Sequence, residues 1–159
     1  VVQCGYKQLA DDYIRIMEKY RMHPDCINLE ITESASMSAK KTLLGNMCRL
    51  REYGVHFSLD VFGTGQSNLN YIVEMPVDIV KFDREMSQAF FRDEKAQYVM
   101  NAAMQMIQGM QLKIVSEGIE DKQQYLEMEK LGIDYIQGYY FSKPLPEKEF
   151  LAFLHKNND

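Results

Sequence analysis

Several residue types are scarce in this 159-residue sequence, and each scarcity excludes a class of protein. Tryptophan is absent, and the three cysteines, Cys4, Cys26 and Cys48, form neither a CxxC pair nor a zinc-finger spacing. Their odd number and scatter favour free thiols in a reducing cytoplasm over a disulfide framework. No apolar run approaches the ~20 residues that cross a bilayer, and no secretory signal opens the chain. We therefore expect a cytoplasmic location and no membrane segment in this chain.

Basic residues are also in deficit, because 18 Lys and Arg stand against 23 Asp and Glu, giving a formal net charge of −5. That balance argues against binding to DNA or to an anionic membrane surface. A small phosphate ligand stays open, since a bound metal ion can supply positive charge locally. Hydrophobic residues make up 46% of the chain, so we expect one globular domain with a sizeable core. The sequence begins at Val1, inside an expected strand, which indicates a piece of a longer polypeptide.

Linkers rich in Gly, Ser or Pro are missing too, and short β-rich runs alternate with helical segments instead. The expected strands are Ile27–Glu33, His56–Phe62, Val77–Asp83, Lys113–Ile119 and Tyr135–Phe141, with Val1–Cys4 as a weaker sixth. The expected helices span Tyr6–Tyr20, Ala39–Leu50, Ala96–Ile107, Asp121–Leu131 and Pro146–His155. This alternation predicts an α/β fold with a parallel sheet, either an open doubly wound sheet or a (β/α)₈ barrel.

Polar residues at the ends of the expected strands favour the barrel. A glycine-rich phosphate loop is not indicated, because Gly63-Thr64-Gly65 lacks both a third glycine and the lysine of a P-loop. One or two polar side chains at the end of successive strands are typical of a barrel's active face. These residues are Glu30, Glu33, Asp60, Lys81, Asp83, Glu117, Glu120 and Gln137.

Three of these acids interrupt apolar strands, where an unpaired carboxylate is costly. On adjacent parallel strands, Glu30, Asp60 and Glu117 would converge at one place. Carboxylate oxygens from several elements suit Mg²⁺, Mn²⁺ or Ca²⁺. Lys81 would add a cation that handles phosphate or orients water. A structural network of ion pairs at the barrel rim is the alternative interpretation of the same residues.

Five motifs in a fixed order connect the chain to a known family. They are L-E-I-T-E-S at Leu29–Ser34, L-D-V-F-G-T-G at Leu59–Gly65, P-V-D-I-V-K-F-D at Pro76–Asp83, V-S-E-G-I-E at Val115–Glu120 and Q-G-Y-Y-F-S-K-P at Gln137–Pro144. The ordered set resembles the EAL domain, a bacterial hydrolase that linearises cyclic di-GMP to pGpG. The resemblance implies a modified TIM (β/α) barrel. About six of its eight strands would lie in this chain. Residues 1–159 would form the EAL-like domain without its first strands and E-A-L motif.

The resemblance also implies roles for individual residues, with Mg²⁺ or Mn²⁺ as the cofactor. Glu30 corresponds to a metal ligand, Asp60 to a ligand that bridges two metals, and Glu117 to a ligand of the second metal. Lys81 corresponds to the lysine that orients the attacking water, so the implied catalytic residues are Lys81, Glu30 and Asp60. Four further positions on the active face match by resemblance: Glu33, Asp83, Glu120 and Gln137.

Two positions depart from the family pattern. Val61 stands where the family has the second Asp of D-D-F-G-T-G, and Gln3 where it has a metal-binding Asn. Lost ligands weaken the electrostatic stabilisation that a two-metal hydrolase relies on. We therefore expect an impaired or inactive signalling domain that acts by binding cyclic di-GMP or by protein interaction. Two alternatives are an active phosphodiesterase within the full-length protein and a scaffold that binds no nucleotide.

The expected partners follow from the incomplete barrel and from the family. An open barrel exposes two strand edges, which predicts a homodimer or larger oligomer. The family resemblance implies cyclic di-GMP as a ligand and sensory or GGDEF-type domains in the parent protein.

Overall fold

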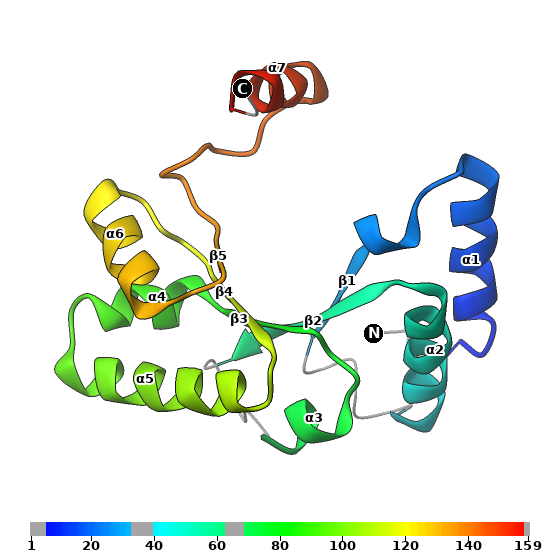
Figure 1. Cartoon of the computed structure of the whole chain (residues 1–159), viewed down its shortest axis with the longest axis horizontal. Helices are drawn as coiled ribbons and strands as arrows, with labels where there is room; N and C mark the ends of the chain where they lie inside the picture. The colour runs from blue at the N-terminus through cyan, green and yellow to red at the C-terminus, as the bar shows by residue number, and fades with distance from the viewer. Residues whose placement is uncertain (1–5, 33–39, 63–68, 158–159) are drawn as a thin grey trace.

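The chain forms a parallel sheet with helices against one of its faces (Figure 1). The computed structural model describes residues 6–32, 40–62 and 69–157, without the side chains of residues 60–62 and 69–71. The weak strand expected at Val1–Cys4 therefore lies outside the described residues. The expected alternation of strands and helices is confirmed, and with it the α/β class.

Five strands make up the described sheet, in the order β1-β2-β3-β4-β5, and every pairing is parallel. Spatial order thus equals chain order, as in a sheet that winds one βα unit at a time into a barrel. Within the described residues, β1 pairs only with β2 and β5 only with β4, so the sheet is an open arc. The strands are β1 (Asn28–Ile31), β2 (His56–Phe62), β3 (Ile79–Phe82), β4 (Lys113–Ser116) and β5 (Tyr135–Ile136).

Seven α-helices are present in the described part of the chain, two more than the sequence predicted. The short helices α3 and α4 were missed, and α4 begins where Asp83 accepts a hydrogen bond from the Met86 amide at 2.8 Å. Gly132 ends α6 with φ of +78°, as its position predicted. The helices are α1 (Leu9–Tyr20), α2 (Lys40–Tyr53), α3 (Leu69–Glu74), α4 (Arg84–Phe90), α5 (Glu94–Gly109), α6 (Lys122–Leu131) and α7 (Glu147–Asn157), with a 3₁₀ turn η2 (Pro24–Cys26).

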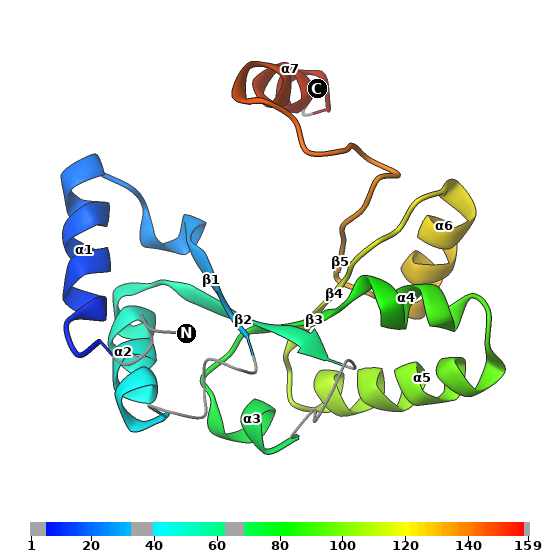
Figure 2. The same cartoon turned by 180° about the vertical axis from the view of Figure 1, so that it is seen from behind.

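The hydrophobic core lies between the sheet and the helices on one side of it, which include α2, α3 and α5 (Figures 1 and 2). Side chains alternate between the two faces of a strand. Val80 and Phe82 of β3 are fully buried on the helix-covered face, as is Ile114 of β4. On the same face, the buried Ser116 hydroxyl lies 2.9 Å from the Ser87 hydroxyl of α4. Lys81, which alternates with Val80 and Phe82 along β3, therefore points to the other face, which we call the open face.

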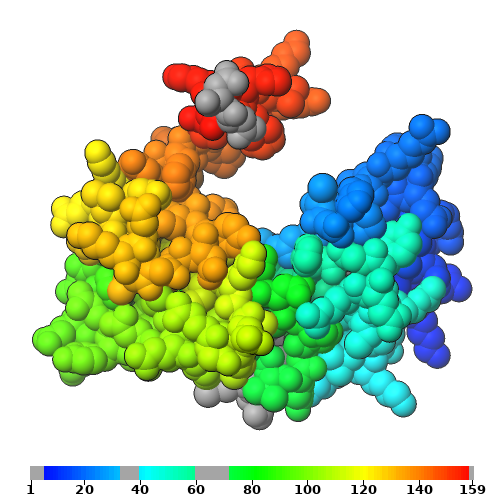
Figure 3. Space-filling model, in the orientation of Figure 1, coloured from blue at the N-terminus to red at the C-terminus, as the bar shows by residue number. Residues whose placement is uncertain are grey.

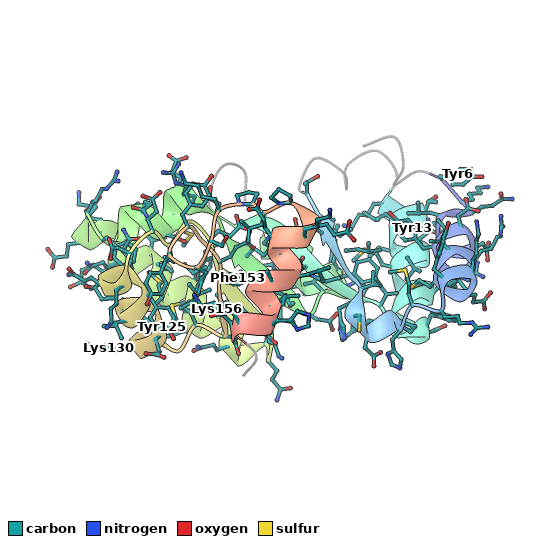
Figure 4. The ribbon with its side chains drawn as sticks, turned by 90° about the horizontal axis from the view of Figure 1, so that it is seen from above. Tyr6, Tyr13, Tyr125, Lys130, Phe153 and Lys156 are labelled. Atoms are coloured by element: carbon teal, nitrogen blue, oxygen red, sulfur yellow. The ribbon has the colours of Figure 1, made fainter. Side chains whose placement is uncertain are left out.

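Helix α7 stands apart from the other helices, on the side of the sheet opposite α3 and α5 (Figures 1 and 2). The space-filling view shows a hollow between this C-terminal segment and the N-terminal part of the chain (Figure 3). From above, α7 crosses over the sheet and carries Phe153 (Figure 4). Phe150 and Phe153 line an apolar groove of about 750 Å³ together with Ile79 and Val115 of the open face.

Candidate active site

The centre of the candidate site is Lys81, which β3 places on the open face. Its side chain is only 8% exposed, and its ammonium contacts two carboxylates. The Nζ atom lies 2.5 Å from Oε1 of Glu30 on β1 and 2.6 Å from Oε1 of Glu117, the residue after β4. The fold therefore brings together three residues that the sequence analysis identified separately. Glu30 lies 51 residues before Lys81 in the chain, and Glu117 lies 36 residues after it.

Strand register explains why these side chains meet. Glu30 is the register partner of Ser58 on β2, and Lys81 that of Val115 on β4. The Glu117 amide donates to the Phe82 carbonyl oxygen at 3.0 Å, which extends the β3–β4 ladder by one residue. All the strands end at the same edge of the sheet because they run parallel. The site is thus assembled by topology, with each side chain fixed to a paired strand.

The Lys81 ammonium stays charged despite its burial. Burial lowers the pKa of Lys81, while hydrogen bonds to Glu117 and Glu30 and the charges of both carboxylates raise it more, so the net pKa lies above the ordinary lysine value. The Glu117 side chain is 23% exposed and that of Glu30 is 50% exposed. The arrangement is one protected cation held between two carboxylates that solvent still reaches.

Asp60 and Val61 lie in an irregular stretch of β2, between the strands that carry Glu30 and Lys81. Leu59 pairs with Val80 and Phe62 pairs with Phe82, so three steps along β2 oppose two steps along β3. Such a bulge bends a strand and re-aims its side chains, and it is common beside active sites. The side chains of Asp60 and Val61 fall outside the described residues, as do Glu33 and Gln3.

The remaining predicted residues surround the Lys81 cluster without joining it. The Asp83 carboxylate caps α4. The Glu120 carboxylate lies 2.7 Å from Nη2 of Arg84. Gln137 lines a small pocket of about 200 Å³ that also includes Arg84, Glu117 and Glu120. Glu117 therefore connects this pocket to Lys81.

Sequence reasoning missed Arg84 and two glutamines of the neighbouring helices, Gln88 and Gln124. Arg84 begins α4, the helix that the sequence did not predict, so its ion pair with Glu120 had no visible signal. Gln88 and Gln124 are 36 residues apart in the chain and meet through hydrogen bonds between α4 and α6. A contact between two amides on different helices leaves no periodic pattern in the sequence.

The donors around Lys81 fit a divalent metal only in part. Carboxylate oxygens are the correct ligand type for Mg²⁺ or Mn²⁺. Two carboxylates, Glu30 and Glu117, are available among the described side chains, and both already contact the Lys81 ammonium. In that part of the chain, no group of three or more His, Cys, Asp or Glu residues could hold one ion. An octahedral site needs about six oxygens, so these two carboxylates alone would leave most positions to other ligands.

None of the helices described is both long enough and apolar enough to cross a bilayer. The parallel sheet, the polar strand ends and the Lys81 cluster define a barrel-type domain with a cluster of charged groups at the carboxyl edge of the strands. The family model of the EAL domain matches residues 3–144. The chain therefore belongs to the EAL domain family, whose members include cyclic di-GMP phosphodiesterases.

Relatives and solved structures agree with this assignment. The chain is 31% identical over 151 residues to cyclic di-GMP phosphodiesterase RocR of Pseudomonas aeruginosa, covering 95% of this chain and 38% of RocR. The EAL enzyme Bd1971, solved with cAMP and cyclic di-GMP bound, superposes with a TM-score of 0.90 at 31% identity, over 96% of this chain and 40% of that one. The EAL domain of Mycobacterium smegmatis DcpA gives a TM-score of 0.90 at 28% identity, over 98% and 70% of the two chains.

These matches confirm the predicted family and its TIM-barrel-like fold. The chain spans less than half the length of RocR and of the signalling protein YkoW from Bacillus subtilis. Multidomain relatives include the bifunctional diguanylate cyclase and cyclic di-GMP phosphodiesterase MucR of Pseudomonas aeruginosa, of which the chain covers 22%.

Proposed function

We propose that this chain is a catalytically impaired EAL domain that signals by binding cyclic di-GMP or by protein interaction. The observation that carries the proposal is the substitution in the L-D-V-F-G-T-G motif, where Val61 replaces a carboxylate with an apolar side chain. Valine has no oxygen to offer a metal ion. Gln3 adds a second departure, since its side chain is one methylene longer than the asparagine of the family pattern.

The ion pairs of Lys81 support the same proposal. Glu30 and Glu117 would be metal ligands in a fully active site, with Asp60 as a third carboxylate on the strand between. With fewer carboxylates present, the site would offer a divalent ion less negative charge, while Glu30 and Glu117 keep the Lys81 ammonium as a partner. Mg²⁺ or Mn²⁺ would then bind weakly, and the activation of water that depends on such ions would be lost. Glu33, Asp83, Glu120 and Gln137 would remain as contacts on the active face.

A second candidate function is an active phosphodiesterase within a longer protein. Its support is that Lys81, Glu30 and Glu117 still converge on one point. In this version Lys81 would orient the attacking water, and Lys81, Glu30 and Asp60 would form the catalytic set. The two candidates differ in turnover, and both allow the ligand to bind.

The wider setting of the protein is part of the proposal. Residues 1–159 would form most of one EAL domain in a cytoplasmic bacterial signalling protein, joined to sensory or GGDEF-type domains. The relative MucR is a bifunctional diguanylate cyclase and cyclic di-GMP phosphodiesterase, and this combination in one chain supports the arrangement. The unpaired outer edges of β1 and β5 in the described sheet support association into a homodimer or larger oligomer. Light scattering that gave a monomer at high concentration would contradict the association.

Calorimetric titration of cyclic di-GMP into the protein, with Mg²⁺, with Mn²⁺ and with chelator, tests the proposal. We expect saturable binding together with little or no conversion to pGpG, which chromatography of the same mixtures measures. Val61→Asp should then raise Mn²⁺ affinity and turnover, because it returns one oxygen ligand. Val73→Asp is the matched control, since Val73 is 70% exposed on α3 and lies outside the motif. Rapid turnover by the unmodified protein would instead establish the second candidate.

A further inference from the structure

The loop that carries Glu117 is held between two helices and a neighbouring strand. This loop, Glu117–Glu120, begins where β4 ends, and its first residue contacts Lys81. On the sheet side, the Ile119 amide donates to the Gln137 carbonyl oxygen at 3.2 Å. The Ile119 carbonyl oxygen in turn accepts from the Tyr140 amide at 3.0 Å. These two backbone bonds fix one side of the loop, while the Gly118 carbonyl and the Glu120 amide face the helices.

Gln88 of α4 and Gln124 of α6 meet these two backbone groups. Nε2 of Gln88 donates to the Gly118 carbonyl oxygen at 2.8 Å. Oε1 of Gln124 accepts from the Glu120 amide, also at 2.8 Å. The two side chains bond each other reciprocally, with Nε2 of Gln88 at 3.2 Å from Oε1 of Gln124 and Nε2 of Gln124 at 3.3 Å from Oε1 of Gln88. Both side chains are half-buried, so water competes only partly for these bonds.

We infer that Gln88 and Gln124 are positioning residues that fix the Glu117 carboxylate beside Lys81. The inference rests on the proposed function, because it gives the glutamines a role at the site where a cation and cyclic di-GMP would bind. Neither glutamine touches Lys81 or Glu30. They act through the backbone of the loop: Gln88 connects the loop to α4, and Gln124 connects it to α6.

The two glutamines are not equivalent, and this gives the inference a sharp consequence. Gln88 serves the loop as a donor, because its amide nitrogen meets a carbonyl oxygen. Gln124 serves the loop as an acceptor, because its amide oxygen meets an N–H group. A glutamate has the same shape as glutamine but can only accept when ionised. Gln88→Glu should therefore release the loop, whereas Gln124→Glu should keep both of its accepted hydrogen bonds and lose only the one that it donates to Gln88, which does not reach the loop.

The position of Gln124 strengthens this contrast. Gln124 lies in the first turn of α6, where Asp121 caps the helix by accepting from the Gln124 amide at 2.9 Å. A negative charge is favourable at a helix N-terminus. Gln123→Glu is the matched control on the same turn, since the exposed Gln123 side chain bonds Glu127 and does not reach the loop.

Amide hydrogen exchange and Mn²⁺ titration of the full chain test the inference. We expect Gln88→Glu to speed exchange at the Ile119 and Glu117 amides about tenfold, as loss of a hydrogen bond worth roughly 1–1.5 kcal/mol implies. We expect the same variant to weaken Mn²⁺ binding by a similar factor. Gln124→Glu and the control Gln123→Glu should leave both measurements within about twofold of the parent.

A second pair of variants keeps the test decisive if Gln88→Glu does not fold. Gln124→Leu removes the acceptor and should loosen the loop, and Gln124→Glu should restore it. Equal effects of Gln88→Glu and Gln124→Glu, or no effect of either Gln88→Glu or Gln124→Leu, would overturn the inference. Failure of the proposed function would be visible separately, as a parent protein that binds neither Mn²⁺ nor cyclic di-GMP. The exchange rates would then still decide whether the glutamines position the loop.

Discussion

Replacing Gly138 with alanine should destabilise the protein strongly, although it adds only one methyl group. A Cβ atom at Gly138 would lie 2.0 Å from the carbonyl oxygen of Ile119 and 2.4 Å from its amide nitrogen. Both atoms belong to the backbone, so no side chain can rotate away. The two chain segments would have to separate, and the hydrogen bonds Ile119 N–H to Gln137 O and Tyr140 N–H to Ile119 O join them at this point.

The expected size of the effect follows from those contacts. Two backbone hydrogen bonds contribute about 1 kcal/mol each, net of their exchange with water. Overpacking that forces the backbone to shift costs about 1–3 kcal/mol more. We therefore expect Gly138→Ala to lower the free energy of unfolding by about 3–5 kcal/mol. For a domain of this size that is a fall in Tm on the order of 6–20 °C.

Gly45→Ala is the matched control and should have the opposite sign. Gly45 lies inside α2, and a Cβ atom there would have no heavy atom within 4 Å. Alanine is favoured over glycine in a helix interior by about 0.5–1 kcal/mol. Urea denaturation followed by circular dichroism measures both variants on the same scale. A Gly138→Ala protein as stable as the parent would refute the packing argument.

Three further predictions concern the site and its support. Because the pKa of Lys81 is raised, its ion pairs should stabilise the fold below the ordinary lysine pKa of about 10.4 and lose that contribution as pH rises through the folded value. Urea midpoints across that range should show this loss, and Lys81→Met should lack it. Ser116→Ala should lower the free energy of unfolding by about 1–3 kcal/mol, because it leaves the buried Ser87 hydroxyl without this partner. The double variant Ser87→Ala, Ser116→Ala should lose less than the sum of the two single variants. Thermal unfolding of the parent, the two single variants and the double variant measures this coupling, and additive effects would disprove it. Asp78→Ala should lower Tm by a few degrees, because Asp78 accepts a hydrogen bond from the Phe57 amide at 3.1 Å and forms an ion pair with Arg51. An unchanged Tm would mean that these contacts do not contribute to stability.

Strand prediction succeeded where apolar residues formed a run with clear ends. The run His56–Phe62 coincides with β2. Tyr135–Phe141 was predicted as a strand of similar length, yet β5 ends at Ile136. The cause is the close approach of Gly138 to the Ile119 backbone, which depends on a loop about 20 residues earlier in the chain and which composition does not report.

The residues of the candidate site also fall into those that the sequence could predict and those that it could not. Glu30, Lys81 and Glu117 could be found because each is a charged residue inside or directly after an apolar strand. Asp83 was predicted on the active face, but its cap on α4 was not, since a short helix directly after a strand has too little sequence for a period to show. The glutamine pair depends on how two helices pack and has no local signal at all. The roles assigned to Asp60 and Val61 remain predictions.

The chain-order arrangement of the strands also has a kinetic consequence. Paired strands are close in sequence, since Asn28 meets His56, Ile79 meets Lys113 and Val115 meets Tyr135. Each strand can therefore add to its predecessor as it leaves the ribosome, and each closure costs a similar, modest entropy. The Lys81–Glu30 pair spans 51 residues and crosses an intervening strand. It can close only after β1, β2 and β3 have joined, and the Lys81–Glu117 pair only after β4 has added, so we expect the site to form later than the strand pairings that it spans.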